Sequence, residues 1–233
     1  MEETYFMSSK TLLEWDELGS KIWETGLRKG VLYPQSNNSY PKGVAWNGLT
    51  SVEETPDGAE ANDFYADDIK YASVRSTENY KGTINAYTYP DEFMACNGEI
   101  AVVKGVSIGQ QTRQTFGLCY RTIIGNDTDG EEYGYKLHLV YGATISPSQK
   151  THSTVNDSPE LEELSWEFDT VPVSVSGYKN TATLEIDSTQ VEASKLAELE
   201  AILYGTPADG GTAEVPARLP FPDEVISIMG VAG

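Results

Sequence analysis

The chain contains few of the residues on which chemistry at protein sites usually depends. Its 233 residues include only two cysteines, Cys96 and Cys119, and only two histidines, His138 and His152. No glycine-rich phosphate loop and no G-x-S-x-G elbow is present, and neither histidine has a neighbour at metal-ligand or catalytic-triad spacing. Both thiols lie in apolar-patterned segments, which indicates buried, reduced cysteines. The sequence therefore predicts no enzymatic activity, no cofactor and no metal ion.

Basic residues are scarce as well. The chain has 16 Lys and Arg residues against 36 Asp and Glu residues, which gives a net charge of −20 and a pI near 4.3. Nucleic-acid binding needs a basic surface toward the phosphates, so a general nucleic-acid-binding protein is excluded. No stretch approaches the ~20 consecutive apolar residues of a membrane span, and no secretion signal is visible near the N-terminus. We therefore expect a protein made in the cytoplasm, with no membrane partner.

A strong alternating pattern covers residues 112–145. Aromatic and aliphatic residues recur at every second position on both sides of a polar turn, which predicts two long strands in a hairpin. The turn, residues 126–132, carries alternate acids as a calcium loop does, but strands flank it and the required later acid is missing, so a solvated hairpin turn is preferred. Because the strands, 113–124 and 133–145, exceed the usual ~5–6 residues, we expect them to belong to a sheet that continues between subunits.

The rest of the pattern predicts a mainly β fold, a β-sandwich or partial barrel with one flanking helix. The helix is expected at about 189–204, where Thr189 and Glu192 have capping-box spacing and leucines recur at helical spacing. Pro90, followed by two acids, predicts a short second helix at about 90–97. Further strands are predicted at residues 21–27, 31–33, 69–75, 80–89, 100–106, 163–169, 181–187 and 225–229.

A single β-domain is expected to follow an N-terminal arm. The arm is residues 1–19, and the domain is residues 20–233. A Gly/Pro/Ala-rich linker at about 205–220 precedes the last predicted strand. Residues 53–68 carry seven acids and no basic residue, and we expect them to form a solvated acidic turn and not a metal site.

Two long polar loops, residues 34–48 and 146–159, are predicted to contact other subunits, because loops of this length in compact domains usually have a function. The first loop carries Tyr40 and Trp46, which we expect to be exposed. Trp46 would anchor a contact while the monomer folds without it. The candidate interface residues are Trp15, Tyr40, Trp46, Arg113, Arg121 and His152.

Two predicted strands, 163–169 and 181–187, each alternate an apolar face with a largely acidic face. We expect both apolar faces to pack against the helix at about 189–204. The opposite faces then carry Glu163, Glu167, Asp169, Glu185 and Asp187. Periodicity leaves open whether these acids face the interior of an assembly or the outer solvent.

Six segments spread over about residues 30–226 resemble one known family. They are GVLYPQSNNSYPKGVAWNGLTSVEETPDGAEANDFYADDIKY, INAYTYPDEF, QTRQTFGLCYRTIIGND, YGYKLHLVYGATISPSQK, SWEFDTVPV and ARLPFPDEVI. In this order they are similar to the major tail (tail-tube) proteins of long-tailed, siphovirus-like bacteriophages. The similarity rests on many short segments and not on a single motif.

The resemblance implies a structural virion protein that forms hexameric rings, which stack into a hollow tail tube. It implies contacts with other tail proteins, such as the tape measure and the tail terminator. It also implies assembly in the bacterial cytoplasm and a final location in the tail. DNA would pass through the lumen without specific binding, and an acidic wall suits this role because fixed negative charge repels phosphates.

Two other classes of protein fit parts of the sequence. An extracellular carbohydrate- or cell-surface-binding β-sandwich could stack a ligand on Tyr40, Trp46 and Tyr87. A glycosidase-type hydrolase could draw two carboxylates from the many acids, although nothing in the sequence singles out a pair. Electron microscopy distinguishes these classes, since only the tail-tube interpretation predicts rings or tubes.

Overall fold

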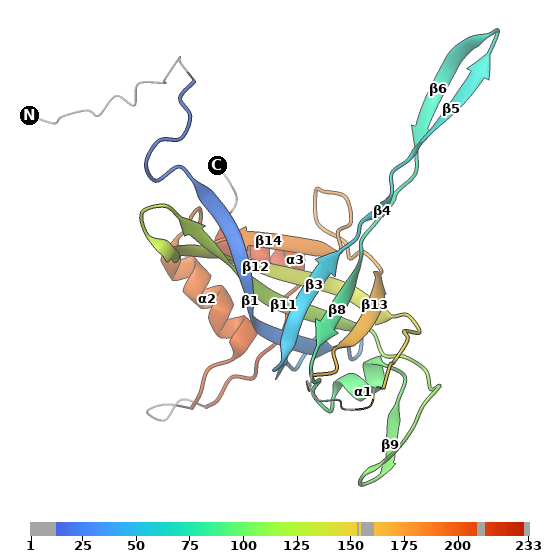
Figure 1. The fold of residues 1–233 in the computed structure, drawn as a ribbon, viewed down its shortest axis with the longest axis vertical. Helices are drawn as coiled ribbons and strands as arrows, with labels where there is room; N and C mark the ends of the chain where they lie inside the picture. The colour runs from blue at the N-terminus through green and yellow to red at the C-terminus, as the bar shows by residue number, and fades with distance from the viewer. Residues whose placement is uncertain (1–12, 153, 155–160, 209–212, 231–233) are drawn as a thin grey trace, which may run out of the picture.

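Most of the regular structure is antiparallel β-sheet (Figure 1). The computed structural model describes residues 13–152, 154, 161–208 and 213–230. The strands are β1 Ile22–Pro34, β2 Val44–Ala45, β3 Leu49–Glu54, β4 Asp57–Gly58, β5 Ala61–Ala66, β6 Ile69–Arg75, β7 Glu78–Asn79, β8 Lys81–Ala86, β9 Ile100–Val103, β10 Val106–Ile108, β11 Phe116–Asn126, β12 Gly130–Ile145, β13 Leu164–Thr170 and β14 Thr183–Asp187. The helices are α1 Phe93–Cys96, α2 Ala193–Tyr204 and α3 Pro222–Met229. The predicted mainly β fold with flanking helices is confirmed.

One large sheet curls until its two ends meet. Its strands lie in the order β2, β1, β11, β12, β13, β8 and β3, while β14 pairs separately with β12. In the described part of the chain β1 and β3 touch without backbone pairing, so the sheet forms an incompletely closed barrel. Three two-stranded pairs, β4–β7, β5–β6 and β9–β10, lie outside it.

The predicted central hairpin is the centre of this sheet, and continuation of the sheet between subunits stays a prediction. β11 pairs with β1 on one edge and β12 on the other, and β12 pairs with β11 on one edge and with β13 and β14 on the other. Neither strand therefore offers a long free edge to another subunit. The edges of this sheet left without a partner among the described strands include those of β2, β3, β14 and the first part of β1.

The hairpin turn is closed by the buried side chain of Asn126. Its carbonyl oxygen accepts hydrogen bonds from the backbone N–H groups of Thr128 and Asp129, at 3.2 and 2.6 Å. An Asn side chain that replaces a backbone carbonyl in this way favours a tight turn. The predicted hairpin turn is confirmed.

A single long strand replaces the two short strands and the turn predicted over residues 21–33. β1 shifts register against β11 near Gly26 and near Lys29, and both residues have positive φ, +63° and +53°. Such bulges bend a strand without ending it. The basic and glycine residues that indicated a turn in the sequence thus mark a bulge.

β12 changes its partner strand at Gly142. Before this residue β12 pairs with β14, and after it β12 pairs with β13. The φ of Gly142 is +63°, and a Cβ there would lie 2.2 Å from the backbone oxygen of Val171. Only glycine fits this close backbone contact. The extra residue of the bulge also reverses which face of the sheet the following side chains occupy.

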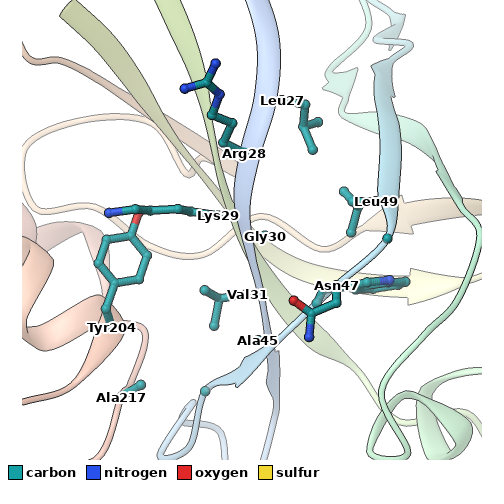
Figure 2. A pocket seen from close by; sticks show the side chains of 13 residues that line it. Leu27, Arg28, Lys29, Gly30, Val31, Ala45, Asn47, Leu49, Tyr204 and Ala217 are labelled. Carbon is teal, nitrogen blue, oxygen red and sulfur yellow. The ribbon is translucent and has the colours of Figure 1, made fainter. Parts of the chain in front are cut away.

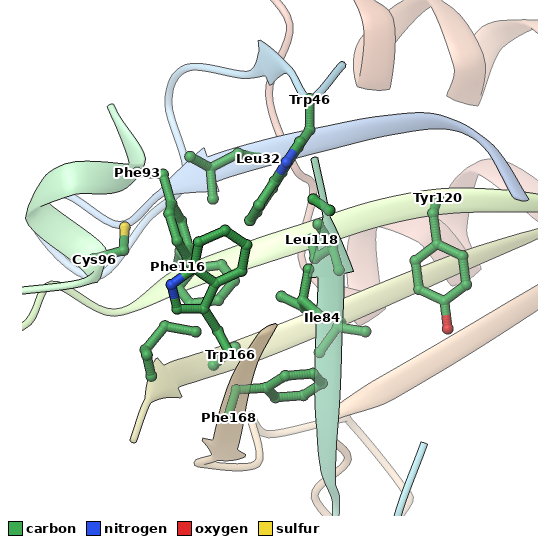
Figure 3. Close-up of a cluster of buried hydrophobic side chains, with 14 residues drawn as sticks. Leu32, Trp46, Ile84, Phe93, Cys96, Phe116, Leu118, Tyr120, Trp166 and Phe168 are labelled. Atoms are coloured by element: carbon green, nitrogen blue, oxygen red, sulfur yellow. The ribbon is translucent and has the colours of Figure 1, made fainter. Parts of the chain in front are cut away.

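Both faces of the sheet are buried, each by a different set of apolar side chains. Figure 3 shows the inner set, in which aromatic rings pack together inside the barrel, among them Trp46, Phe93, Phe116, Trp166 and Phe168. On the outer face α2 and α3 cover a second set, among them Tyr33, Cys119, Leu139, Tyr141, Leu196, Leu199, Leu203 and Val225. Strands buried on both faces explain why β11 and β12 carry apolar residues at consecutive positions.

The bulge at Gly142 overturns the expectation that residues 163–169 and 181–187 pack against the same helix. Ile186 of β14 lies opposite Leu137 and packs with α2 on the outer face. Phe168 of β13 lies opposite Ile145, beyond the bulge, and packs inside the barrel. Leu137 and Ile145 are eight positions apart and would share a face in a regular strand.

The two helices predicted from the sequence are present with different starts. α2 begins at Ala193, and no side chain caps it, because the Thr189 hydroxyl donates instead to the carboxylate of Asp187 at 2.6 Å. The predicted capping box is therefore wrong, whereas the predicted end at Gly205 is confirmed. α1 covers only four residues, since Pro90 lies before the helix and does not open it.

The strand predicted at residues 225–229 is a helix. α3 begins with Pro222 at its first turn, and Asp223 and Glu224 follow in that turn. Proline and acids favour a helix start, because proline lacks the N–H group that would be unpaired there and acids complement the helix dipole. The apolar residues of α3 then pack beside α2 on the outer face of the sheet.

Candidate functional site

The two aromatic residues expected to form a contact surface are buried inside the subunit. Trp46 is 3% exposed, donates a hydrogen bond from Nε1 to the Thr88 carbonyl at 2.9 Å, and packs on Phe93. Tyr40 is 2% exposed, and its hydroxyl accepts a hydrogen bond from the backbone N–H of Gly142 at 2.9 Å. The expectation of exposed anchors on residues 34–48 is therefore wrong.

Arg121 is also engaged within its own subunit. Its guanidinium lies over the ring of Tyr135, 4.2 Å from the centroid, and 3.7 Å from the carboxylate of Glu200 on α2. Its side chain is largely buried. This arginine stabilises the contact between α2 and the sheet and presents little surface to another subunit.

The other three predicted interface residues lie near or on the surface. Trp15 is 76% exposed, and His152 is exposed with its Nδ1 3.2 Å from the carboxylate of Glu162. Arg113 is half-buried beside the turn after α1. Most of the predicted arm and part of the loop 146–159 lie outside the described residues, so Trp15 and His152 stay predictions.

The five predicted wall acids do not form one surface. Glu167 and Asp169 lie on the face of β13 opposite Trp166 and Phe168, outside the barrel, and Glu163 directly precedes this strand. Glu185 and Asp187 lie on the inner side of β14, opposite its outward-packed Ile186. The bulge in β12 places the two sets on opposite faces. Only the two acids of β13 therefore form an acidic outer face.

Charged groups from several strands meet around His138 at one end of the barrel. His138 is 7% exposed, and its Nε2 lies 2.9 Å from Thr122 Oγ1 and 3.5 Å from a carboxylate oxygen of Glu24. Its Nδ1 lies 3.7 Å from a carboxylate oxygen of Glu185. Lys136 forms ion pairs with both glutamates, at 3.1 and 3.0 Å. The cluster ties β1, β11, β12 and β14 together.

The same cluster reaches across the unpaired seam of the barrel. The ring of Tyr120 stacks on His138, and its hydroxyl donates a hydrogen bond to the carboxylate of Glu54 at 2.7 Å. Glu54 belongs to β3, whereas Glu24 belongs to β1. Side chains therefore connect the two edges that backbone hydrogen bonds do not join.

Opposite charges shift the pKa values within this cluster. Burial raises the pKa of Glu24, but hydrogen bonds from Thr122 and Lys136 outweigh burial, and the pKa falls below its usual value. Hydrogen bonds to Glu185 and Glu24 hold the pKa of Lys136 above its usual value. The cluster thus favours charged partners near neutral pH.

The described residues contain no group of three or more His, Cys, Asp or Glu side chains arranged to hold a metal ion. Burial raises the pKa of the Cys96 and Cys119 thiols to about 12, so neither is a reactive thiolate near neutral pH. No helix among these residues combines the length and apolar composition needed to cross a bilayer.

A long arm projects from the barrel, and the sequence interpretation missed it. β6 pairs with β5, and Figure 1 shows the two strands extending far from the body beyond β4. Asp67 and Asp68 form the turn with φ of +52° and +61°. Two consecutive positive φ values define the type I′ turn of a tight hairpin. The acidic segment 53–68 thus contains a strand of this arm.

The arm carries large apolar side chains that nothing in the described chain covers. Those more than half exposed are Phe64, Tyr65, Ile69, Tyr71 and Val74. The two-residue Asp-Asp turn between aromatic-rich runs was the sequence signal for this hairpin. The acids around this turn favoured the interpretation of the segment as a solvated turn, so the hairpin was not predicted.

A second projecting hairpin, β9–β10, is also rich in exposed aliphatic residues. They are Ile100, Val102, Val103, Val106 and Ile108. Figure 1 places this hairpin at the opposite end of the long axis from the arm. The monomer therefore exposes apolar hairpins at both ends.

A hollow of about 630 Å³ opens between β1, the start of β3 and the end of α2 (Figure 2). Its charged residues are Arg28 and Lys29, and no acid lines it. The Lys29 ammonium lies over the Tyr204 ring, 5.0 Å from the centroid, and no described carboxylate pairs with it. In a chain with a net charge of −20, this hollow is a local basic surface.

No protein-family model matches the chain, and no curated protein matches it in sequence.

Proposed function

We propose that this protein is a self-assembling structural subunit, the repeating unit of a bacteriophage tail tube. In this proposal it forms hexameric rings that stack, and it contacts the tape measure and tail terminator in the virion tail. Phage DNA passes through the lumen without specific binding. The tail-tube assignment rests on the resemblance of the sequence segments, and self-assembly rests on the surface of the subunit.

The observation that carries the proposal is the pair of apolar hairpins projecting from opposite ends of the body. Contiguous exposed apolar surface is uncommon on monomeric proteins and marks interaction sites. Two-stranded ribbons are marginally stable in water without a surface to pack against. Both hairpins would gain stability in an assembly in which neighbouring copies cover them.

The unpaired edges also support an assembly. Natural proteins cover or blunt free strand edges, because such edges pair with other chains. Here β3 and β14 each pair on only one edge among the described strands. The acidic outer face of β13 suits a lumen wall, because negative charge there would hold DNA phosphates away.

The carbohydrate-binding alternative loses its main support. Two of its three stacking residues, Tyr40 and Trp46, are buried in the core, and only Tyr87 is about half exposed. A single exposed tyrosine does not form the aromatic surface on which a carbohydrate ligand would stack. We therefore propose only the role as a structural subunit.

The test is electron microscopy and sedimentation of the purified chain over a range of concentrations. Self-assembly predicts rings or tubes above a threshold concentration. Tyr71→Ser, on the arm, should raise that threshold about tenfold, as loss of an interface aromatic costs about 1–2 kcal/mol. Tyr178→Ser is the matched control, because Tyr178 is 77% exposed and Tyr71 76%, but Tyr178 lies off the arm. A wild-type chain that stays monomeric at high concentration contradicts the proposal.

A further inference from the structure

We infer that the tip of the β5–β6 arm docks in the basic hollow between β1 and β3 of a second copy of the chain. The inference rests on the proposed self-assembly and assigns it a donor surface and a receiving surface.

The arm tip is a preformed acidic ligand. Asp67 and Asp68 occupy both central positions of the turn, and their carboxylates form no ion pair or side-chain hydrogen bond with the described residues. The only ion pair within the arm, Lys70 with Asp63 at 2.8 Å, lies further down the strands. A short turn of fixed conformation loses little entropy when it binds.

The hollow is complementary to this tip. Lys29 faces it with no carboxylate partner, and Arg28 pairs with Glu131 in an exposed contact at 3.1 Å. Exposed ion pairs contribute little, so Arg28 is available to an incoming acid. Apolar lining residues, among them Leu27 and Leu49, offer contact area to the aromatic residues beside the tip.

Charge selects this hollow over two others on the body. A space of about 970 Å³ at the foot of the arm has an acid, Glu78, beside Arg75 and Lys179. A space of about 780 Å³ lies between α1 and the β9–β10 hairpin. Three acids line it, Asp91, Glu92 and Glu99, against one base, Lys104. An acidic tip would be repelled there, whereas the hollow at Lys29 presents only positive charge.

The positions of tip and hollow determine the kind of assembly. Leu49, at the start of β3, lines the hollow, and Glu54, at the end of β3, leads into the arm. Donor and receiver thus lie at opposite ends of the same strand, as Figure 1 shows for β3 and the arm. A contact between two different surfaces is head-to-tail and repeats without limit unless it closes into a ring. We expect each tip to dock in the next copy, which generates a continuing stack, whereas reciprocal docking of two copies would stop at a closed dimer.

Disulfide cross-linking tests this contact directly. Both native cysteines are buried, so thiols introduced on the surface react without competition. The variant Lys29→Cys with Asp68→Cys carries one thiol in the hollow and one on the tip. Under a mild oxidant such as copper-phenanthroline, docking predicts a ladder of covalent dimers, trimers and larger oligomers. The control is Lys179→Cys with Asp68→Cys, since Lys179 is exposed and lines a different hollow, the one at the foot of the arm.

The outcomes separate this inference from the proposed function. A ladder from the first variant and none from the control supports docking at Lys29. A ladder from the control only, or dimers that do not extend, overturns it, because the tip then contacts another surface. Rings or tubes in the microscope without any ladder overturn the docking inference and leave self-assembly standing. A circular dichroism spectrum equal to that of the wild type verifies the fold of both variants.

Charge neutralisation provides a second measurement. Lys29→Gln and the pair Asp67→Asn with Asp68→Asn remove the charges and keep side chains of similar size in the bulge of β1 and in the turn of the arm. Each change should raise the assembly threshold about threefold, as loss of an exposed ion pair does. The combination should be no worse than either change alone, because both remove the same interaction. If the combined variant raised the assembly threshold by the product of the two separate increases, the two sites would act independently, and this would contradict the docking contact.

Discussion

The imidazole of His138 lies flat on the phenol ring of Tyr120, with centroids 4.7 Å apart and planes 4° from parallel. This stack sits where the barrel is not closed by backbone hydrogen bonds. The Tyr120 hydroxyl holds Glu54 of β3, and His138 lies beside Glu24 of β1. At this end of the barrel, side-chain contacts therefore hold β1 and β3 together, whereas backbone hydrogen bonds hold neighbouring strands together elsewhere.

The charged cluster predicts a pH-dependent contribution to stability from Lys136. The pKa of Glu24 is lowered, so its stabilisation is present above the usual carboxyl pKa and is lost as pH falls through the folded-state value. Lys136→Met should therefore lower Tm by about 2 °C or more at pH 7, and by less at pH 3. Thermal unfolding followed by circular dichroism measures both values. Lys70→Met, which breaks an exposed ion pair on the arm, is the control and should change Tm little at either pH. An equal loss at both pH values would contradict the assignment.

Trp46 should be essential to the fold. Trp46→Ala removes a ring packed on Phe93 and Trp166 inside the barrel, and such a cavity costs about 3–5 kcal/mol of the free energy of unfolding. Trp15→Ala, at a residue 76% exposed, should change it by less than about 0.5 kcal/mol. Urea unfolding below the assembly threshold measures both variants. A Trp46→Ala monomer as stable as the wild type would reverse the conclusion that this side chain is part of the core.

Gly142→Ala should destabilise the subunit by about 3 kcal/mol or more. A Cβ there would lie 2.2 Å from the backbone oxygen of Val171, and the φ of +63° is itself unfavourable for alanine. Gly177→Ala is a matched control, since φ is +80° but no atom lies within 4 Å of the added Cβ. It should cost only the backbone strain. If the two variants unfold at the same urea concentration, the close contact with Val171 is not what requires glycine.

The native thiols should not react in the folded subunit. Cys96 and Cys119 are fully buried and their pKa values are raised to about 12, so a disulfide reagent such as DTNB at pH 8 should release no colour until the chain unfolds. Two thiols per chain should then react in denaturant. Rapid reaction of either cysteine in native buffer would show that the core opens on that timescale.

The acidic outer face of β13 leads to a prediction about DNA passage. Glu167→Lys should leave tubes able to form but slow the exit of DNA, and added salt should relieve the delay over the Debye-screening range. Glu198→Lys, on the exposed side of α2, is the control. Ejection measured from particles that carry each variant separates the two positions. Normal ejection from Glu167→Lys particles at low salt would place this face of β13 outside the lumen.

The sequence alone determined the elements whose signals are local. Alternation over residues 112–145 indicated the central hairpin, leucine spacing indicated α2, and the shortage of histidine and cysteine argued against a catalytic site. These inferences need only the neighbours of each residue along the chain. The start of α2 was wrong, however, because Asp187 competes for the Thr189 hydroxyl, and α3 was assigned as a strand although Pro222 and two acids favoured a helix.

Only the tertiary structure decided which faces the side chains occupy. One extra residue at Gly142 reverses the alternation in β12, so Trp166 lies inside the barrel while Ile186 lies outside under α2. The same bulge separates Glu167 from Glu185, which periodicity had placed together. The sequence also did not indicate which strands pair. β6 pairs with β5 across the Asp67-Asp68 turn, and the two strands form a projecting arm. Periodicity describes the spacing of side chains along one strand. A bulge and a pairing partner are properties of two strands. The bulge in β12 and the pairing of β6 with β5 therefore decided which side chains the subunit buries and which it exposes.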